Sequence, residues 1–399
     1  MEKIIKEIYS KNDKKILLFV IDGLSGLPVD GKTELEKANT PNLDNLARKS
    51  SCGRILPIGW GITPGSGPAH LSIFGYDPFK YQIGRGILEA LGVGADLKKG
   101  DVAVRCNFCT IDKNGTIVDR RAGRIETEKT RLLVQRLQKE ISKIEDIEIH
   151  LYPGKEHRFV LVLRGEGISD NLNDTDPQKE GEKPLELVAK DEKSEKTKRV
   201  VYEFLKKVKE ILKGEEKANF ALLRGFSSLP DWETFEEKWN LKACGIAYYP
   251  MYRGLAKLVG MDTVENIENF EEGVKILSEV FKKYDFVYLH YKETDKKGED
   301  GDFEGKVKEI ERVDKYIPEI LNSGADVIAI TADHSTPCAL KSHSWHPTPL
   351  MIYSPFIEPD PCEKFDEKEV LKGYLGTIKG YELLPLLLAL SGKLKKFGA

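Results

Sequence analysis

The chain is poor in cysteine and has no long apolar run, and both absences narrow the class of protein. Six cysteines are scattered over 399 residues, which excludes a disulfide-stapled secreted scaffold and is typical of a reducing compartment. The longest apolar run near the C-terminus, residues 383–390, is far too short to span a bilayer. Residues 1–15 are charged and lack the apolar core of a signal peptide. We therefore expect a cytoplasmic protein.

An excess of charge of either sign is absent as well. The chain has 62 basic and 65 acidic residues, for a formal net charge of −3. This balance argues against nucleic acid or a membrane surface as a partner. Nothing in the sequence indicates an oligomeric state. The length suits two domains, or one large domain with an insertion.

Continuous apolar runs predict the strands of a buried sheet. Residues 16–21, 286–290 and 327–331 each form such a run, which is typical of strands buried on both faces of a parallel sheet. A helix predicted over residues 303–322 lies between the last two runs and completes a βαβ unit. Residues 349–353 predict one more strand. We expect an α/β fold with a mostly parallel sheet flanked by helices.

The middle of the chain has a different pattern and reads as an inserted α+β domain. We place the discontinuous domain at residues 1–78 and 240–399, and the insertion at 79–239. Within the insertion the sequence predicts strands over residues 102–110, 116–119, 147–151, 158–163 and 219–223, and helices over 126–143 and 194–213.

A stretch rich in glycine and proline, residues 61–70, frames a single serine. Gly65 and Gly67 tolerate backbone angles that other residues resist, which predicts a tight turn that exposes the hydroxyl of Ser66. The residues from Pro68 onward predict a short helix, and a hydroxyl just before a helix start favours an anionic phosphate. The alternative is a surface turn whose serine only caps the helix.

Carboxylate and imidazole side chains follow three of the predicted strands. In open α/β sheets the carboxyl ends of the strands form the edge where ligands bind. Such side chains suit Mn²⁺, Zn²⁺ or Co²⁺, and their number is enough for two metals. The alternative is that they cap helices and bind water. They are Asp22 after the first run, Asp295 and Glu299 after the second, and Asp333, His334 and His343 after the third.

Taken together, these pieces resemble the alkaline phosphatase superfamily, and most closely the archaeal-type, cofactor-independent phosphoglycerate mutases. The resemblance implies an alkaline-phosphatase-like sheet, a small phosphorylated substrate, and the interconversion of 3-phosphoglycerate and 2-phosphoglycerate in glycolysis and gluconeogenesis. The matching segments are spread over nearly the whole chain and are specific only as a set. They are residues 19–23, 38–44, 63–71, 74–78, 119–124, 170–177, 331–334 and 343–349.

The resemblance also implies roles for individual residues. Ser66 matches the serine that accepts the phosphoryl group and ligates one metal ion. The other ligands of that ion match Asp22, Asp333 and His334, and two ligands of a second ion match Asp295 and His343. The inserted domain would hold the substrate through arginines. The candidates are Arg121 and Arg124, then Arg120 and Arg158, with Arg253 as a basic residue near the metals.

One position departs from the family pattern. The family usually carries a histidine four residues after the aspartate, and here Glu299 follows Asp295 at that distance. Oxygen donors favour Mg²⁺ and Mn²⁺, whereas imidazole suits Zn²⁺ and Co²⁺. We expect two divalent ions, Mn²⁺ or Mg²⁺ before Co²⁺ or Zn²⁺, with Glu299 as a ligand. The alternative is that Glu299 is a solvated carboxylate in an acidic loop.

Two other functions stay open from the residues alone. A metal-dependent phosphomonoesterase, or another phosphotransferase of the superfamily, would share the metal core and differ in whether water reaches the phosphoserine. A catalytically silent binding protein with a decayed second metal site is supported by Glu299 alone. The intact Ser66 and the Asp333–His334 pair argue against it.

Overall fold

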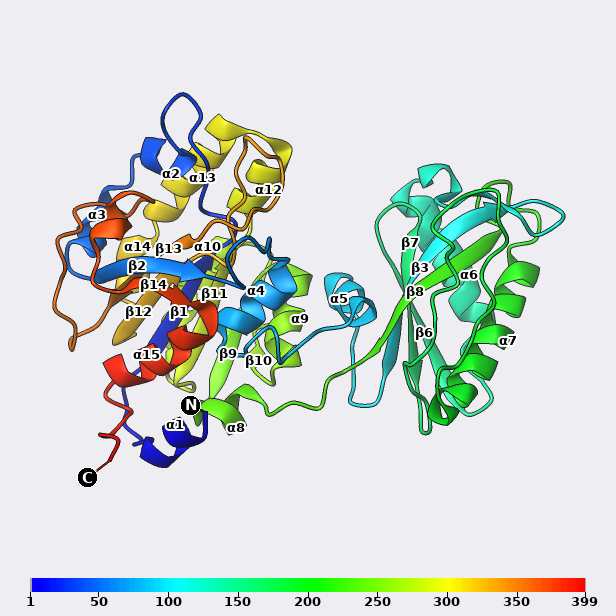
Figure 1. Ribbon diagram of the computed structural model, residues 1–399, viewed down its shortest axis with the longest axis horizontal. Helices are drawn as coiled ribbons and strands as arrows, with labels where there is room; N and C mark the ends of the chain where they lie inside the picture. The colour runs from blue at the N-terminus through cyan, green and yellow to red at the C-terminus, as the bar shows by residue number, and fades with distance from the viewer. Residues whose placement is uncertain (1, 399) are drawn as a thin grey trace. The chain divides into compact units, whose positions relative to one another are not determined.

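The computed structural model describes residues 2–398 and divides the chain into two compact units (Figure 1). The larger unit holds the chain up to Gln82 and again from Trp232 onward, and the smaller unit runs from Ile83 to Asp231. The smaller unit therefore lies a few residues inside the insertion expected over residues 79–239. Among the described residues, no helix is long and apolar enough to cross a lipid bilayer.

The larger unit is built on an eight-stranded sheet in the order β10-β9-β11-β1-β12-β13-β2-β14. β13 runs antiparallel to both of its neighbours, and the other pairs are parallel. The mostly parallel α/β fold predicted from the apolar runs is confirmed. The strands are β1 (Ile16–Ile21), β2 (Ser51–Leu56), β9 (Ala243–Ile246), β10 (Asp262–Thr263), β11 (Phe286–Tyr291), β12 (Val327–Thr331), β13 (Thr348–Tyr353) and β14 (Gly376–Lys379).

Strand β1 lies inside this sheet because all six of its residues are apolar and buried. Its register pairs Ile21 with Tyr291 of β11 and Val20 with Thr331 of β12, so the three strands end side by side. Burying one such side chain stabilises the fold by about 1.5–3 kcal/mol. The edge where these strands end is thus formed by three strands whose residues are all buried.

Helices surround the sheet of the larger unit (Figure 1). The prediction of a single helix over residues 303–322 is wrong, because the structure has two helices there. Pro318 lies in the first turn of the second, where its missing N–H and its ring prevent the first helix from continuing. The helices are α1 (Glu2–Ile8), α2 (Glu34–Lys37), α3 (Pro41–Ala47), α4 (Ser66–Ile73), α8 (Phe235–Trp239), α9 (Pro250–Leu258), α10 (Phe270–Lys275), α11 (Leu277–Phe281), α12 (Glu293–Asp300), α13 (Phe303–Asp314), α14 (Ile317–Leu321) and α15 (Leu383–Leu390), with 3-10 turns η3 (Glu369–Lys372) and η4 (Gly380–Glu382).

The smaller unit is a six-stranded antiparallel sheet in the order β4-β3-β7-β6-β5, with β8 paired to β3. Helices α6 and α7 cover one face, and their apolar residues join those of the strands in one buried cluster (Figure 1). The elements are β3 (Val102–Ile111), β4 (Ile117–Asp119), β5 (Lys143–Ile144), β6 (Ile147–Pro153), β7 (Arg158–Arg164), β8 (Phe220–Ser228), α5 (Arg85–Gly92), α6 (Thr127–Glu140), α7 (Glu195–Ile211), η1 (Ala122–Arg124) and η2 (Glu192–Ser194).

Candidate active site

The three aligned strands bring their following side chains to one place. Asp22 comes directly after β1, and Asp333 and His334 follow β12. His334 Nε2 lies 3.4 Å from an oxygen of Asp22, 3.1 Å from one of Asp333 and 3.2 Å from Ser66 Oγ. Four side chains from three distant parts of the sequence therefore converge on one point, and all but the half-buried Ser66 are fully buried.

Hydrogen bonds around His334 place its ring proton on Nδ1 and leave the lone pair on Nε2. The hydroxyl of Thr336 donates to Asp295 Oδ1 at 2.5 Å, so its oxygen accepts from Nδ1–H of His334 at 3.0 Å. Burial lowers the pKa of His334 to about 3, which keeps the ring neutral. With the proton on Nδ1, the lone pair of Nε2 points at Asp22, Asp333 and Ser66, as in histidines that bind metals.

A second group lies beside the first, on α12 and the loop after β12. His343 Nε2 is 3.6 Å from Asp295 Oδ1, and its ring stacks on that of His334 at 3.6 Å. Nδ1–H of His343 donates to the carbonyl of Pro64 at 2.9 Å, so Nε2 again carries the free lone pair. The structure thus brings together both sets of residues that the sequence nominated as metal ligands.

The charges of the site fit divalent cations. Both carboxylate oxygens of Asp22 and one of Asp333 are buried without a hydrogen-bond partner, an arrangement that is costly unless a cation supplies the missing interaction. Burial and the carboxylates of Asp22 and Asp295 raise the pKa of Asp333 well above its usual range. Burial alone would also raise the pKa of Asp22, but the Lys292 ammonium and the His290 ring, each 3.2 Å from Asp22 Oδ2, hold it well below its usual range. The excess of negative charge in a buried pocket is what two metal ions would neutralise.

Ser66 is held by a helix rather than by an unusual turn. Gly65 has φ −87° and extended backbone, and Ser66 and Gly67 are the first residues of α4, so the prediction of a turn with special backbone angles is wrong. Burial lowers the pKa of His70 to about 3, and its Nδ1–H donates to the carbonyl of Ser66 at 2.9 Å. The rigid first turn of α4 therefore fixes where the hydroxyl lies.

Glu299 lies on a helix and faces the second group. The run after Asp295 was expected as a loop in the alternative reading, but residues 293–300 form α12. Spacing of four residues puts Glu299 one turn beyond Asp295 on the same face. Its Oε1 is 3.8 Å from His343 Nε2, while 55% of its side chain is exposed. Burial and the Asp295 carboxylate raise the pKa of Glu299, so it shares the electrostatic environment of the site.

Substitution of Glu299 should change which divalent metal ion the second group prefers. We expect Glu299→Gln to weaken metal activation, because it removes one negative charge, and Glu299→His to move the preference toward Co²⁺ or Zn²⁺. The measurement is activity against Mg²⁺, Mn²⁺, Co²⁺ and Zn²⁺ concentration. Glu293→Gln on the same helix is the control. Three indistinguishable profiles for wild type and the two Glu299 variants would make Glu299 a surface carboxylate.

Sequence reasoning missed Lys292, which lies between the two groups. Its ammonium is 3.2 Å from Asp22 Oδ2 and 2.5 Å from Asp295 Oδ2, and it donates to Tyr252 Oη at 3.0 Å. Its position next after β11 places it at the same sheet edge as Asp22, and that position was the available clue. Thr336, which orients His334, was missed because a hydroxyl carries no charge pattern.

The arginines nominated in the smaller unit have different surroundings. Arg121 and Arg124 are exposed and flank Ala122 and Gly123, and residues 122–124 have three successive positive φ angles of 49°, 64° and 49°. Such backbone strain is stored mainly at functional sites. Arg120, in contrast, is engaged by a bidentate pair with Asp176 at 2.9 and 2.7 Å. In the larger unit Arg253 donates to the carbonyl of Tyr248 at 3.3 Å.

Arg158 belongs to a group of three arginines. The sequence nominated Arg158 but not its neighbours Arg105 and Arg224. Arg105 of β3 is paired in register with Arg224 of β8, and Asn107 with Arg158 of β7. The Nε atoms of all three arginines are buried without a hydrogen-bond partner. Burial and the nearby arginines lower the pKa of Arg105, although the Glu89 carboxylate, 3.0 Å from its Nη1, opposes them. The alternation Val104–Arg105–Cys106–Asn107 in a buried strand was the signal for this group.

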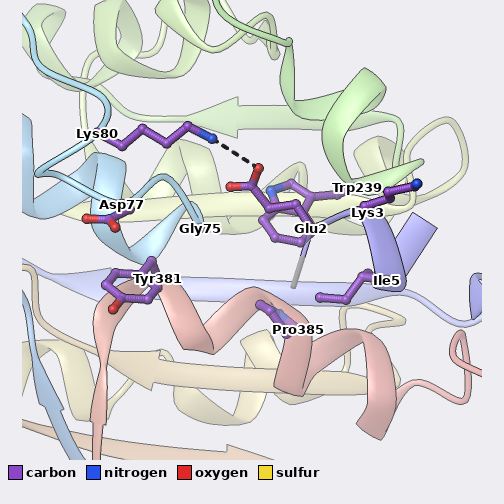
Figure 2. A pocket seen from close by; sticks show the side chains of 9 residues that line it. All are labelled: Glu2, Lys3, Ile5, Gly75, Asp77, Lys80, Trp239, Tyr381 and Pro385. Atoms are coloured by element: carbon purple, nitrogen blue, oxygen red, sulfur yellow. Dashed lines mark hydrogen bonds and ion pairs between the residues drawn. The ribbon is translucent and has the colours of Figure 1, made fainter. Parts of the chain in front are cut away.

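A separate hollow of about 380 Å³ lies elsewhere on the larger unit and contains none of the candidate metal ligands (Figure 2). Glu2 of α1 and Lys80 form an ion pair of 3.5 Å across it, and Trp239 and Tyr381 supply aromatic walls. The candidate metal ligands and Ser66 therefore lie at the edge of the sheet and not in this hollow.

Comparison with protein sequences identifies relatives along the whole chain. A family model for 2,3-bisphosphoglycerate-independent phosphoglycerate mutase matches residues 47–218. A Thermotoga maritima protein described as a probable 2,3-bisphosphoglycerate-independent phosphoglycerate mutase is 53% identical over 398 residues, which cover 100% of this chain and 99% of the relative. A Thermus thermophilus protein of the same description is 52% identical over 401 residues, with 99% of each chain covered.

Solved structures agree with the sequence relatives. The cofactor-independent phosphoglycerate mutase from Thermoplasma acidophilum matches with a TM-score of 0.79 at 29% identity, covering 95% of this chain and 100% of that one. A Pyrococcus horikoshii protein matches with a TM-score of 0.78 at 35% identity, covering 97% and 99%. Because full-length relatives share more than half of their residues with it, the chain belongs to the family of 2,3-bisphosphoglycerate-independent phosphoglycerate mutases, which interconvert 2- and 3-phosphoglycerate.

Proposed function

We propose that the chain moves the phosphoryl group of phosphoglycerate through a phosphoserine on Ser66, in a site that holds two divalent cations. The observation that carries the proposal is the contact of 3.2 Å between Ser66 Oγ and His334 Nε2, beside three buried carboxylate oxygens, both of Asp22 and Oδ2 of Asp333, that have no hydrogen-bond partner. One ion would be held by Asp22, Ser66, Asp333 and His334, and the other by Asp295, Glu299 and His343.

The donor sets favour Mn²⁺ or Mg²⁺, and Co²⁺ or Zn²⁺ also fits a mixture of carboxylates and imidazoles. When bound, the ions would lower the pKa of the serine hydroxyl and offset the charge of the transferred phosphoryl group. The unpartnered oxygens of Asp22 and Asp333 support this assignment independently of any relative.

The transfer has two balanced steps. The oxygen of Ser66 attacks phosphorus of 3-phosphoglycerate, the bond to the substrate's 3-oxygen breaks, and glycerate takes up the proton that the serine loses. The 2-hydroxyl of the glycerate then attacks the phosphoserine, the bond to Ser66 breaks, and the serine regains a proton as 2-phosphoglycerate forms. Lys292 would stabilise the negative charge of the phosphoryl oxygens in both steps.

The two units would divide the work. We propose that the larger unit, predicted as residues 1–78 and 240–399, is the metal-binding domain, and that the inserted unit binds the phosphate and carboxylate of the substrate and excludes water. The strained turn that carries Arg121 and Arg124 supports this role, as do the buried Nε atoms of Arg105, Arg158 and Arg224, which have no hydrogen-bond partner. Guanidinium forks suit both anions.

The experiment for the proposed mechanism supplies 3-phosphoglycerate and one divalent metal and follows 2-phosphoglycerate and free phosphate together. We expect 2-phosphoglycerate to form with little free phosphate, and activity to be lost on chelation and restored by Mn²⁺. Phosphate release without 2-phosphoglycerate would mean that water, not the retained glycerate, attacks the phosphoserine. Full turnover in the presence of a strong chelator would contradict the metal site.

Truncation of Arg121 and Arg124 should weaken substrate retention. Each lost charge-assisted contact should cost about 1.5–3 kcal/mol, so the double Arg→Ala variant should bind 3-phosphoglycerate more weakly and release more free phosphate per transfer. Arg131→Ala, an exposed arginine on α6 of the same unit, is the matched control. Unchanged substrate affinity and product ratio in the double variant would remove these two arginines from the substrate site.

A further inference from the structure

Two cysteines and an aspartate converge in the larger unit, and none of them belongs to the group around Ser66. Cys52 lies on β2, between β13 and β14, and Asp360 and Cys362 lie in the irregular segment between β13 and η3. One donor atom from each side chain lies within 4.8 Å of the other two, and all three are buried. We propose that this cluster is a second type of metal site, which binds a thiophilic divalent cation of the Zn²⁺ class.

The carboxylate of Asp360 is oriented by backbone amides and keeps a free lone pair. Its Oδ2 accepts from the N–H of Cys52 at 2.5 Å and of Tyr374 at 3.2 Å. Its Oδ1 accepts only from the N–H of Cys362, at 3.2 Å, among the described residues. An oxygen with two lone pairs and one hydrogen bond can still bind a cation, and amides that hold a carboxylate in place are typical of the surroundings of metal ligands.

The two sulfurs complete a donor set of the kind that zinc prefers. Thiolates bind Zn²⁺ with strong preference, and a closed site has four ligands in tetrahedral arrangement. Cys362 Sγ donates to the carbonyl oxygen of Glu369 at 3.1 Å, which makes that carbonyl the candidate for the fourth donor. Burial raises the pKa of Cys362 to about 12 and that of Cys52 further, so both are thiols until a cation binds. Binding of one Zn²⁺ by two thiols and one carboxylate must therefore release two protons.

The other cysteines provide an internal comparison. Cys106, Cys109, Cys244 and Cys338 are also buried and free, and within residues 2–398 none of them shares a site with two further metal-binding side chains. Burial alone therefore does not produce the cluster. A disulfide would explain two neighbouring cysteines, but it would not use the carboxylate of Asp360.

A cation bound at this site would cross-link an irregular segment to the eight-stranded sheet. The chain between β13 and η3 has no helix or strand among its described residues, so few repetitive hydrogen bonds hold it. Glu367 in the same stretch accepts from the N–H of Gly26 at 3.0 Å and from the hydroxyl of Thr33 at 2.7 Å. The cross-link would thus stabilise a segment that contacts the chain just after Asp22. We expect it to affect the stability of the fold rather than the catalytic rate.

The test uses Co²⁺ as a spectroscopic substitute on the purified full-length chain. Two thiolate ligands should give an intense near-ultraviolet charge-transfer band, which the carboxylate, imidazole and hydroxyl ligands around Ser66 cannot give. We expect the band in wild type, its loss in Cys362→Ala, its retention in Cys244→Ala, and its disappearance when Zn²⁺ is added. Because Zn²⁺ also fits the ligands around Ser66, which Cys362→Ala keeps, Zn²⁺ should raise the unfolding temperature of wild type by more than that of Cys362→Ala, and wild type should release two more protons.

Three results would contradict the proposed metal site at Cys52, Asp360 and Cys362. A wild-type spectrum without the band would do so even if Cys362→Ala failed to fold, and so would a band that survives in a folded Cys362→Ala variant. An unreduced chain whose mass is lower than that of the reduced chain by two hydrogens, with the bond mapped to Cys52 and Cys362, would make the pair a disulfide instead.

Discussion

Replacing Ser66 by alanine should abolish the mutase activity while leaving the fold intact. The hydroxyl is half-buried at the first turn of α4, and its removal leaves no oxygen to receive the phosphoryl group. Loss of a covalent nucleophile typically lowers turnover by several orders of magnitude, so we expect a fall of roughly a thousandfold or more. The measurement is the rate of 2-phosphoglycerate formation with Mn²⁺, beside a circular-dichroism melt.

The control for this variant lies on the same helix. Ser72 is buried in α4, and its hydroxyl has no hydrogen-bond partner among the described residues, so Ser72→Ala should keep wild-type activity. A folded Ser66→Ala enzyme with turnover near that of wild type would rule out the phosphoserine mechanism.

Replacing Lys292 by methionine should lower turnover while strengthening cation binding. The ammonium lies 3.2 Å from Asp22 and 2.5 Å from Asp295, so its removal leaves the two carboxylates with more uncompensated negative charge. The same change removes a positive group that would stabilise the phosphoryl oxygens. One such group is worth roughly 10²–10³ in turnover. We expect the metal concentration for half-activation to fall while kcat falls by about that factor.

Without bound metal, the Lys292→Met variant should also be less stable than wild type. Removing one partner of a buried ion pair costs about 3–5 kcal/mol, because the remaining charge stays buried. Lys296→Met, at an exposed lysine on α12, which begins just after Lys292, is the matched control and should leave the metal requirement, kcat and stability unchanged. If Lys292→Met weakened metal binding and left kcat unchanged, Lys292 would be a structural support of the ligands only.

The parts of the fold that the sequence predicted best are those fixed by burial. Strands β1, β11 and β12 are almost wholly apolar, and a parallel sheet covered on both faces is the packing that such runs require. The positions of Asp22 and Asp333 follow from that sheet, because each lies within two residues of the carboxyl end of its strand. Their convergence with Ser66 depends on the path of α4, which no local pattern specifies.

Elements that depend on tertiary contacts were not predictable in the same way. Residues 293–300 look like an acidic loop with an internal glycine, yet they form α12. Gly298 is required there because a Cβ would lie 2.3 Å from the carbonyl oxygen of Thr336, so the helix packs closely on the loop after β12. Thr336 reaches Asp295 across this close approach, and a reading by residue type and spacing passes over both Thr336 and Lys292.

The arginines of the smaller unit illustrate a second limit. Arg105 and Arg224 are far apart in the sequence and meet only through the antiparallel pairing of β3 with β8. The pairing depends on the whole sheet, so alternation in β3 could mark Arg105 as special but could not supply its neighbours. The turn at Arg121 and Arg124 was nominated by resemblance, and its left-handed backbone adds a physical reason to examine it first.

The most direct test of the central claim is to locate the phosphoryl group during turnover. The enzyme is mixed with 3-phosphoglycerate and Mn²⁺, quenched in acid within a turnover, digested and analysed by mass spectrometry. The mechanism predicts one added phosphoryl group on the peptide that contains Ser66, at Ser66, and none when the metal is chelated. A phosphoryl group on another residue, or rapid formation of 2-phosphoglycerate with Ser66 never modified, would contradict it.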